Sequence, residues 1–206
     1  MKAEKIKTLF LDIGNVLLTN GWDTDARKRA IKSFKLDPEE TESRHKLCFE
    51  TLELGKMNID NYLGNVVFYE PREFSKADFI TFMLNQSKPI PGAVEYFKEL
   101  KKRYGLKVIA VSNEALSLND YRIKTFELDM LFDAFISSCY VGMRKPDAAI
   151  YKMACDISHT RPEEALYVDD LGMYIEVALA LGIPSFHYKG LKEAKDYFDG
   201  LGLTLK

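Results

Sequence analysis

The chain has 206 residues, of which 47% are hydrophobic and 29% charged, with a formal net charge of -2. This is the composition of a globular protein of one good-sized domain, and its interspersed charges exclude the basic surface of a nucleic-acid binder and a polybasic membrane anchor. No apolar stretch approaches the ~18 residues that a membrane span needs.

The amino terminus and the cysteines predict a cytoplasmic protein. Residues 1–5 lead directly into an apolar run, and this pattern is not that of a signal peptide. Cys48, Cys139 and Cys155 lie far apart without metal-ligand spacing. A sparse, odd set of cysteines is typical of reduced thiols in the cytosol.

Five short apolar runs predict the strands of a sheet. Residues 8–11 form an unbroken run that ends in Asp12, as expected for a strand buried on both faces of a parallel sheet. Similar runs follow at 107–111, 134–137, 165–168 and 184–187.

Helical patterns lie between these runs. Apolar residues recur at helical spacing at 94–104, at 150–157 and from 175 to a stop near Gly182. Strands that alternate with helices require right-handed crossovers and a parallel sheet covered on both faces. The sequence therefore predicts an α/β protein with a doubly wound, Rossmann-like sheet.

Residues 17–87 break this alternation and are rich in helix signals. Asp37 and Pro38 form an N-cap followed by a proline at the first helical position. Ser75 and Asp78 form a capping box, and the flanking Phe74 and Phe79 are spaced for a hydrophobic staple. We expect residues 17–87 to form a small helical cap, inserted into a core made of residues 1–16 and 88–206.

Polar residues follow four of the predicted strands. Because ligands of open α/β sheets bind beyond the carboxyl ends of the strands, these residues are the candidates for a functional site. They occur in chain order as Asp12 to Asn15, Ser112-Asn113, Lys145-Pro146 and Asp169-Asp170.

This set suits phosphoryl transfer. A carboxylate such as Asp12 can attack phosphorus, and Mg²⁺ prefers the oxygen ligands that Asp12, Asp169 and Asp170 offer. Lys145 and a divalent cation would make three converging carboxylates tolerable. Ser112 and the amide of Asn113, at a strand-to-helix turn, would hold phosphoryl oxygens.

In this order, the four segments resemble the motifs of the haloacid dehalogenase-like hydrolase superfamily, whose helical cap can follow the first strand. The resemblance implies that Asp12 is the nucleophile and a magnesium ligand, and that Lys145 orients it. It also implies that Ser112 and Asn113 bind phosphate and that Asp170, supported by Asp169, binds the metal. Gly14 would line the substrate site, and its main-chain carbonyl would be a further metal ligand.

Two positions depart from this pattern. The family usually has a second aspartate two residues after the nucleophile as general acid and base, an assistance typically worth roughly 10²- to 10⁴-fold; here that residue is Gly14. Tyr174 stands where an aspartate or asparagine often follows the acidic pair, which alters the usual metal-water network.

Residues 12–17 and 142–146 resemble the subgroup that contains sugar-1-phosphate phosphatases.

We therefore expect a magnesium-dependent phosphatase for a small phosphorylated metabolite, with a sugar phosphate as the finer prediction. One alternative is a metal-independent 2-haloacid dehalogenase that uses Asp12, although the Asp169-Asp170 pair argues against it. Another is a non-catalytic phosphometabolite-binding protein that lacks an acid at Gly14.

Each motif also has a purely structural explanation, because Asp12 could cap a turn and the other polar pairs precede helices. His45 is interpreted as structural, with contact to the site as the alternative. Trp22 and Arg27 could contact substrate, but an aromatic residue at this place more often packs in the cap.

Overall fold

The computed structural model describes residues 5–205, so residues 1–4 of the amino-terminal pattern lie outside the described part. Five parallel strands form one sheet in the order β3-β2-β1-β4-β5. Their bounds are β1 (Thr8–Leu11), β2 (Lys107–Ser112), β3 (Ala134–Ser137), β4 (Ala165–Asp169) and β5 (Ser185–His187). The doubly wound parallel sheet predicted from the apolar runs is confirmed. In the described residues, no helix has the length and apolarity to cross a membrane.

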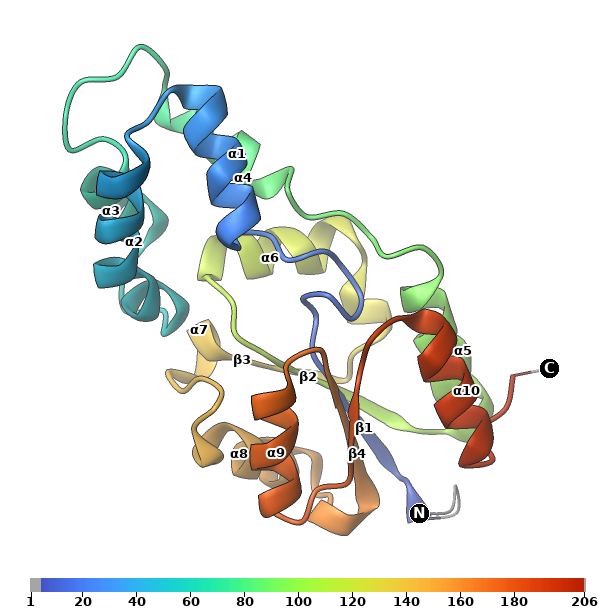
Figure 1. Cartoon of the computed structure of the whole chain (residues 1–206). Coiled ribbons are helices and arrows are strands. Elements are labelled where there is room, and N and C mark those ends of the chain that lie inside the picture. Colours follow the sequence, from blue (N-terminus) through green and yellow to red (C-terminus); the bar gives the residue numbers. More distant parts are fainter. Residues whose placement is uncertain (1–4, 206) are drawn as a thin grey trace.

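Helices cover both faces of the sheet (Figure 1). On one face, α5 (Ala93–Tyr104) and α10 (Leu191–Gly200) pack against alternate strand residues that include Leu9 and Leu11. On the other, α8 (Ala148–Ser158) and α9 (Gly172–Ala180) pack against a set that includes Phe10. Because both faces of the strands are covered, all four residues of β1 are fully buried, including Thr8, whose hydroxyl is hydrogen-bonded to that of Thr160 at 2.7 Å.

Shorter elements complete this part of the chain. They are α6 (Leu116–Thr125), the 3₁₀ turns η2 (Leu128–Met130) and η3 (Pro162–Glu164), and the single-turn α7 (Ser138–Val141). Of these, α6 and α7 follow the carboxyl ends of β2 and β3, and α7 contacts the insert helix α2.

The insert, residues 17–87, contains four helices that lie beyond the carboxyl ends of the strands (Figure 1). They are α1 (Thr24–Phe34), α2 (Pro38–Glu53), α3 (Ile59–Val66) and α4 (Lys76–Leu84). The caps predicted from the sequence are present: Asp37 accepts from the Glu40 N–H, and Ser75 and Asp78 form a capping box.

The insert has an apolar cluster of its own. Phe79, fully buried at its centre, packs against the rings of Trp22, Phe34, Phe68 and Phe74. Nearly all members of the cluster lie between residues 22 and 83. The division into core and cap stays a prediction, and this separate cluster supports it.

Two chain segments connect the insert to the sheet, and they lie side by side. The Thr19 N–H donates to the Lys88 carbonyl at 2.8 Å, and the Ile90 N–H donates to the Leu17 carbonyl at 2.9 Å. The Thr19 hydroxyl also donates to the Gln86 carbonyl at 2.8 Å. The entry and exit of the insert therefore form one cross-linked pair of segments.

We predict that Phe79→Ala lowers the free energy of unfolding by about 3–5 kcal/mol, because it opens a cavity at the centre of the aromatic cluster. Urea denaturation measures the loss. The matched control is Leu47→Ala in the same insert, which removes a side chain that is 81% exposed and should change the stability by less than ~0.5 kcal/mol. A similar, small effect of both substitutions would show that the cluster does not hold the insert together.

Candidate active site

Asp12 stands at the carboxyl end of β1, where the chain leaves the sheet. Its N–H donates to the Val168 carbonyl of β4 at 3.0 Å, so it continues the parallel ladder by one residue. The chain then turns tightly, because the N–H groups of Leu17 and Leu18 both donate to the Ile13 carbonyl at 3.0 Å. Asp12 is buried but lines a cleft, so its carboxylate is both fixed and accessible from one side.

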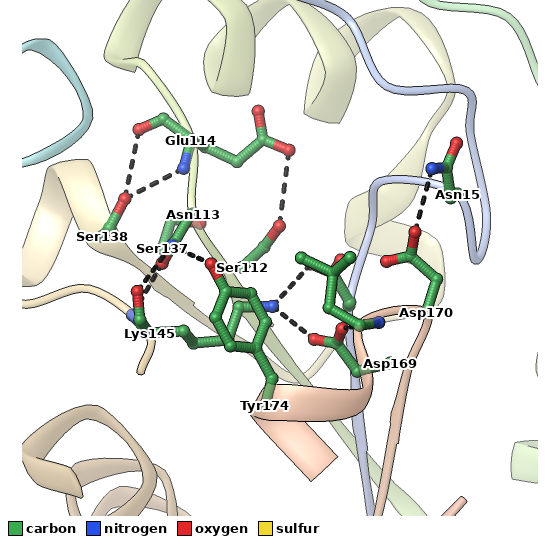
Figure 2. A network of polar contacts seen from close by, with 12 residues as sticks. Asn15, Ser112, Asn113, Glu114, Ser137, Ser138, Lys145, Asp169, Asp170 and Tyr174 are labelled. Atoms are coloured by element: carbon green, nitrogen blue, oxygen red, sulfur yellow. Dashed lines mark hydrogen bonds and ion pairs between the residues drawn. The ribbon is translucent and has the colours of Figure 1, made fainter. Parts of the chain in front are cut away.

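Lys145 lies between two carboxylates (Figure 2). Its Nζ is 3.0 Å from Asp12 Oδ1 and 2.6 Å from Asp169 Oδ2, and its side chain is only 1% exposed. Burial alone would lower the pKa of Lys145, but the negative charges of Asp12 and Asp169 outweigh burial and raise the pKa above its usual value. Lys145 is therefore a permanent cation beside Asp12.

Asp169 is held by the protein on both of its oxygens. Oδ1 accepts from the Leu171 N–H at 2.8 Å, and Oδ2 accepts from Lys145 and from the Tyr167 hydroxyl. Such a fully hydrogen-bonded carboxylate is suited to fixing Lys145.

Ser112 is the last residue of β2, and Asn113, which follows it, lies beside Lys145. The Asn113 carboxamide forms two hydrogen bonds with the main chain of Lys145: Nδ2 donates to the carbonyl at 2.9 Å, and Oδ1 accepts from the N–H at 2.8 Å. Asn113 Nδ2 also lies 3.4 Å from the hydroxyl of Tyr174. The side chain of Asn113 thus fixes the lysine loop, and its main-chain N–H, which has no partner among residues 5–205, is left for a ligand.

Asp12, Asp169 and Asp170 converge, with one oxygen of each within 4.8 Å of the others. Asp170 accepts from Asn15 Nδ2 at 2.9 Å, as Figure 2 shows. Burial raises the pKa of Asp12 to about 7 against the opposing charge of Lys145, and it raises the pKa of Asp170 above its usual value. Burial therefore disfavours the ionised forms of Asp12 and Asp170. This donor set fits a hard divalent cation, which would restore ionisation.

A cleft of about 620 Å³ opens above these residues and is lined by both the sheet and the insert. Gly14, Ser112, Asn113 and Asp170 line its floor. The residues from the insert that line it include Trp22, Arg27 and His45. The structure therefore places these three at the cleft as well as in the packing of the insert.

The arginines of the cleft are paired with carboxylates. Arg27 makes two hydrogen bonds to Glu42, at 2.8 and 3.0 Å, and Arg144 lies 2.8 Å from Glu53 across the boundary between sheet and insert. Burial, reinforced by Arg27, lowers the pKa of His45 to about 4, so this imidazole is neutral at physiological pH.

A further ion pair was not predicted from the sequence. Glu114 and Arg122 form a salt bridge in which the two side chains are 3% and 2% exposed. Arg122 also donates to the Thr19 carbonyl at 2.8 Å and to the Ser87 hydroxyl at 3.0 Å, one partner on each connecting segment. Glu114 could have been noticed, because it follows Ser112-Asn113 at a strand end. Arg122 has no such signal, since its partners are distant in sequence.

The structure thus brings together all seven residues that the sequence singled out. Asp12, Gly14, Ser112, Asn113, Lys145 and Asp170 line one cleft, and Asp169 lies directly behind Lys145. The roles assigned to them stay predictions. Of the histidines interpreted as structural, His187 contacts the Asp170 carbonyl through Nε2 at 2.9 Å.

Comparisons with known proteins agree with this geometry. A family model described as haloacid dehalogenase-like hydrolase matches residues 6–182. A D-ribitol-5-phosphate phosphatase from Bacteroides thetaiotaomicron is 26% identical over 205 residues, covering 88% of this chain and 91% of the relative. Bifunctional epoxide hydrolase 2 from Rattus norvegicus is 35% identical over 86 residues, and the match spans 40% of this chain but only 16% of that protein.

Among solved structures, a HAD family enzyme from Bacteroides thetaiotaomicron in complex with magnesium and inorganic phosphate has the same fold. The TM-score is 0.77 at 20% sequence identity, and the match covers 90% of this chain and 95% of that one. The family resemblance read from the four segments is confirmed.

We predict that Glu114→Ala lowers the free energy of unfolding by about 3–5 kcal/mol, because it leaves the Arg122 guanidinium buried without its counterion. Chemical denaturation of the single variants and of Glu114→Leu/Arg122→Met tests this, and the double variant should lose much less than Glu114→Ala. As a control, Lys28→Ala removes one partner of an exposed ion pair and should cost less than about 1 kcal/mol. Equal losses for the two ion pairs would contradict the account.

Proposed function

Because the chain belongs to the haloacid dehalogenase-like hydrolases, we propose that it is a magnesium-dependent phosphatase that acts on a small phosphorylated metabolite. The observation that carries this proposal is the placement of the buried Asp12 carboxylate between a permanent cation, Lys145, and a second carboxylate, Asp170, on the floor of a cleft. This placement combines a fixed nucleophile with charge compensation for a phosphoryl group.

In the first step, a carboxylate oxygen of Asp12 attacks phosphorus and the bond from phosphorus to the ester oxygen breaks, leaving an aspartyl phosphate and the alcohol product. In the second step, water attacks phosphorus, the bond to Asp12 breaks, and inorganic phosphate is released. Lys145 offsets negative charge beside Asp12 throughout. The Ser112 hydroxyl and the Asn113 N–H are the proposed donors to the phosphoryl oxygens.

Magnesium would be held by Asp12, Asp170 and the main-chain carbonyl of Gly14, and when bound it supplies positive charge at the phosphoryl oxygens. Asp169, also predicted as part of the metal site, has both oxygens engaged by the protein. We therefore propose that Asp169 acts through Lys145 rather than as a direct ligand.

A sugar or polyol phosphate is the proposed substrate class. The D-ribitol-5-phosphate phosphatase that matches nearly the whole chain supports it. The resemblance of residues 12–17 and 142–146 to sugar-1-phosphate phosphatases supports the same substrate class.

A cytoplasmic location remains part of the proposal, and the free thiols of Cys48, Cys139 and Cys155 support it.

Asp12→Asn should abolish magnesium-dependent hydrolysis of p-nitrophenyl phosphate, because the amide is a very poor nucleophile, while the melting temperature shows that the fold is kept. Release of p-nitrophenol measures turnover. Asp156→Asn, an exposed aspartate on α8, is the matched control and should retain wild-type activity. Turnover by Asp12→Asn at the wild-type rate would refute the assignment of the nucleophile.

Asp170→Asn should raise the magnesium concentration that gives half-maximal activity at least ~10-fold, because a neutral amide replaces a charged ligand. Magnesium titrations of wild type, Asp170→Asn and Asp156→Asn measure the shift. Complete removal of divalent cations with a chelator should stop wild-type turnover. Activity that survives chelation, or release of halide from a 2-haloacid, would instead favour metal-independent dehalogenation.

A further inference from the structure

Release of an alcohol from a phosphate ester places negative charge on the departing oxygen, and a donor beside that oxygen accelerates the step. Gly14 has no side chain to offer one. The described carboxylates of the cleft wall are committed elsewhere: Glu42, Glu53 and Glu114 are paired with arginines, and Asp23 caps α1 by accepting from the Ala26 N–H. All four carboxylates have a partner in the protein, although burial raises the pKa of Glu53 above its usual value.

The Asn20 side chain occupies the space that a side chain at position 14 would take. A Cβ placed on Gly14 would lie 2.2 Å from Asn20 Oδ1 and 3.8 Å from Asp12 Oδ2. Any side chain at residue 14 would therefore displace the Asn20 carboxamide, whose Oδ1 is the atom nearest to that position.

The Asn20 carboxamide is available to a ligand. Asn20 lines the cleft and is only half-buried, and its side chain makes no hydrogen bond to any residue between 5 and 205. An amide offers both a donor and an acceptor at one place.

The backbone on both sides of Asn20 is fixed. Thr19 is bonded to Lys88 through its N–H and to Arg122 through its carbonyl, each at 2.8 Å. Gly21 is packed so closely that a Cβ there would lie 2.7 Å from Arg122 Nη2. The backbone that carries Asn20 is therefore held in place, in part by Arg122 of the buried Glu114–Arg122 ion pair.

We propose that Asn20 is a catalytic residue whose carboxamide, turned so that Nδ2 takes the position that Oδ1 has beside residue 14, donates an N–H to the departing ester oxygen. This inference rests on the phosphatase proposed above. When the bond from phosphorus to that oxygen breaks, the electron pair goes to the oxygen. Asn20 stabilises the charge by a hydrogen bond, and the proton that completes the alcohol comes from solvent water, because a carboxamide does not release one.

The primary test is Asn20→Leu, which keeps a similar side-chain shape and removes the hydrogen-bonding groups. For an alkyl phosphate such as ribitol 5-phosphate, kcat should fall roughly 10- to 100-fold, the loss expected for one hydrogen bond to a charged oxygen. For p-nitrophenyl phosphate, whose leaving group needs little stabilisation, kcat should fall less than ~3-fold, with KM little changed for either substrate. Equal effects on the two substrates, or none, would overturn the proposal.

Gly14→Ala adds an independent test, because its methyl group would push the Asn20 carboxamide away. It should reproduce the selective loss on the alkyl ester, whereas adding it to Asn20→Ala should cost little more, since the two changes remove the same contact. Independent, additive losses would contradict the proposed steric relation.

A third measurement does not require turnover. With magnesium and inorganic phosphate added, the side-chain amide signals of Asn20 in a ¹⁵N–¹H spectrum should shift, while those of Asn85, which ends α4, should not. An unchanged Asn20 signal at phosphate saturation would overturn the proposal. Loss of all magnesium-dependent turnover in wild type would instead refute the phosphatase itself, so the two failures are distinguishable.

Discussion

Lys145 is buried with its ammonium group between Asp12 and Asp169, and the rest of the site depends on this arrangement. A charge removed from water is tolerated only with good counterions, so the chain must bring the ends of β1 and β4 and the loop after α7 to one point. The doubly wound sheet does this, because β1 and β4 are neighbours and run in the same direction. Two further carboxamides complete the arrangement: Asn113 holds the main chain of Lys145, and Asn15 holds Asp170. These charged side chains are thereby oriented by the fold before any ligand enters.

The insert is tied to this site through its connections rather than through its own core. Arg122 contacts both connecting segments and is neutralised by Glu114, two residues beyond Ser112. On the opposite side of the cleft, the Ser138 hydroxyl donates to the Glu53 carbonyl at 2.7 Å and accepts from the Glu114 N–H at 2.9 Å. The strand end that carries the proposed phosphate donors is therefore linked through Arg122 to both connecting segments and through Ser138 to the end of α2. Displacement of the insert would disturb these bonds beside the cleft.

Much of this could be predicted from the sequence. Buried parallel strands read as unbroken apolar runs, so the predicted strands agree with the observed ones to about one residue at each end. The site residues could be found because the topology gathers strand ends at one edge of the sheet. The buried Arg122 and the contact between Asn20 and Gly14 could not, since local spacing carries no information about partners roughly a hundred residues away or about side-chain shape. Tyr167 lies within an apolar run and looks like packing, yet its hydroxyl bonds Asp169. The partners of these side chains can be identified only from the contacts in the folded structure.

The pairing of cleft arginines with carboxylates has a consequence for molecular discrimination. Arg27, Arg122 and Arg144 each have an internal counterion. A ligand with a second anionic group could reach one of them only by separating it from its carboxylate, and would leave that carboxylate desolvated. The remaining lining cation of the insert, Lys46, is exposed to solvent at the rim. A ligand whose remaining part is uncharged would leave these three ion pairs intact.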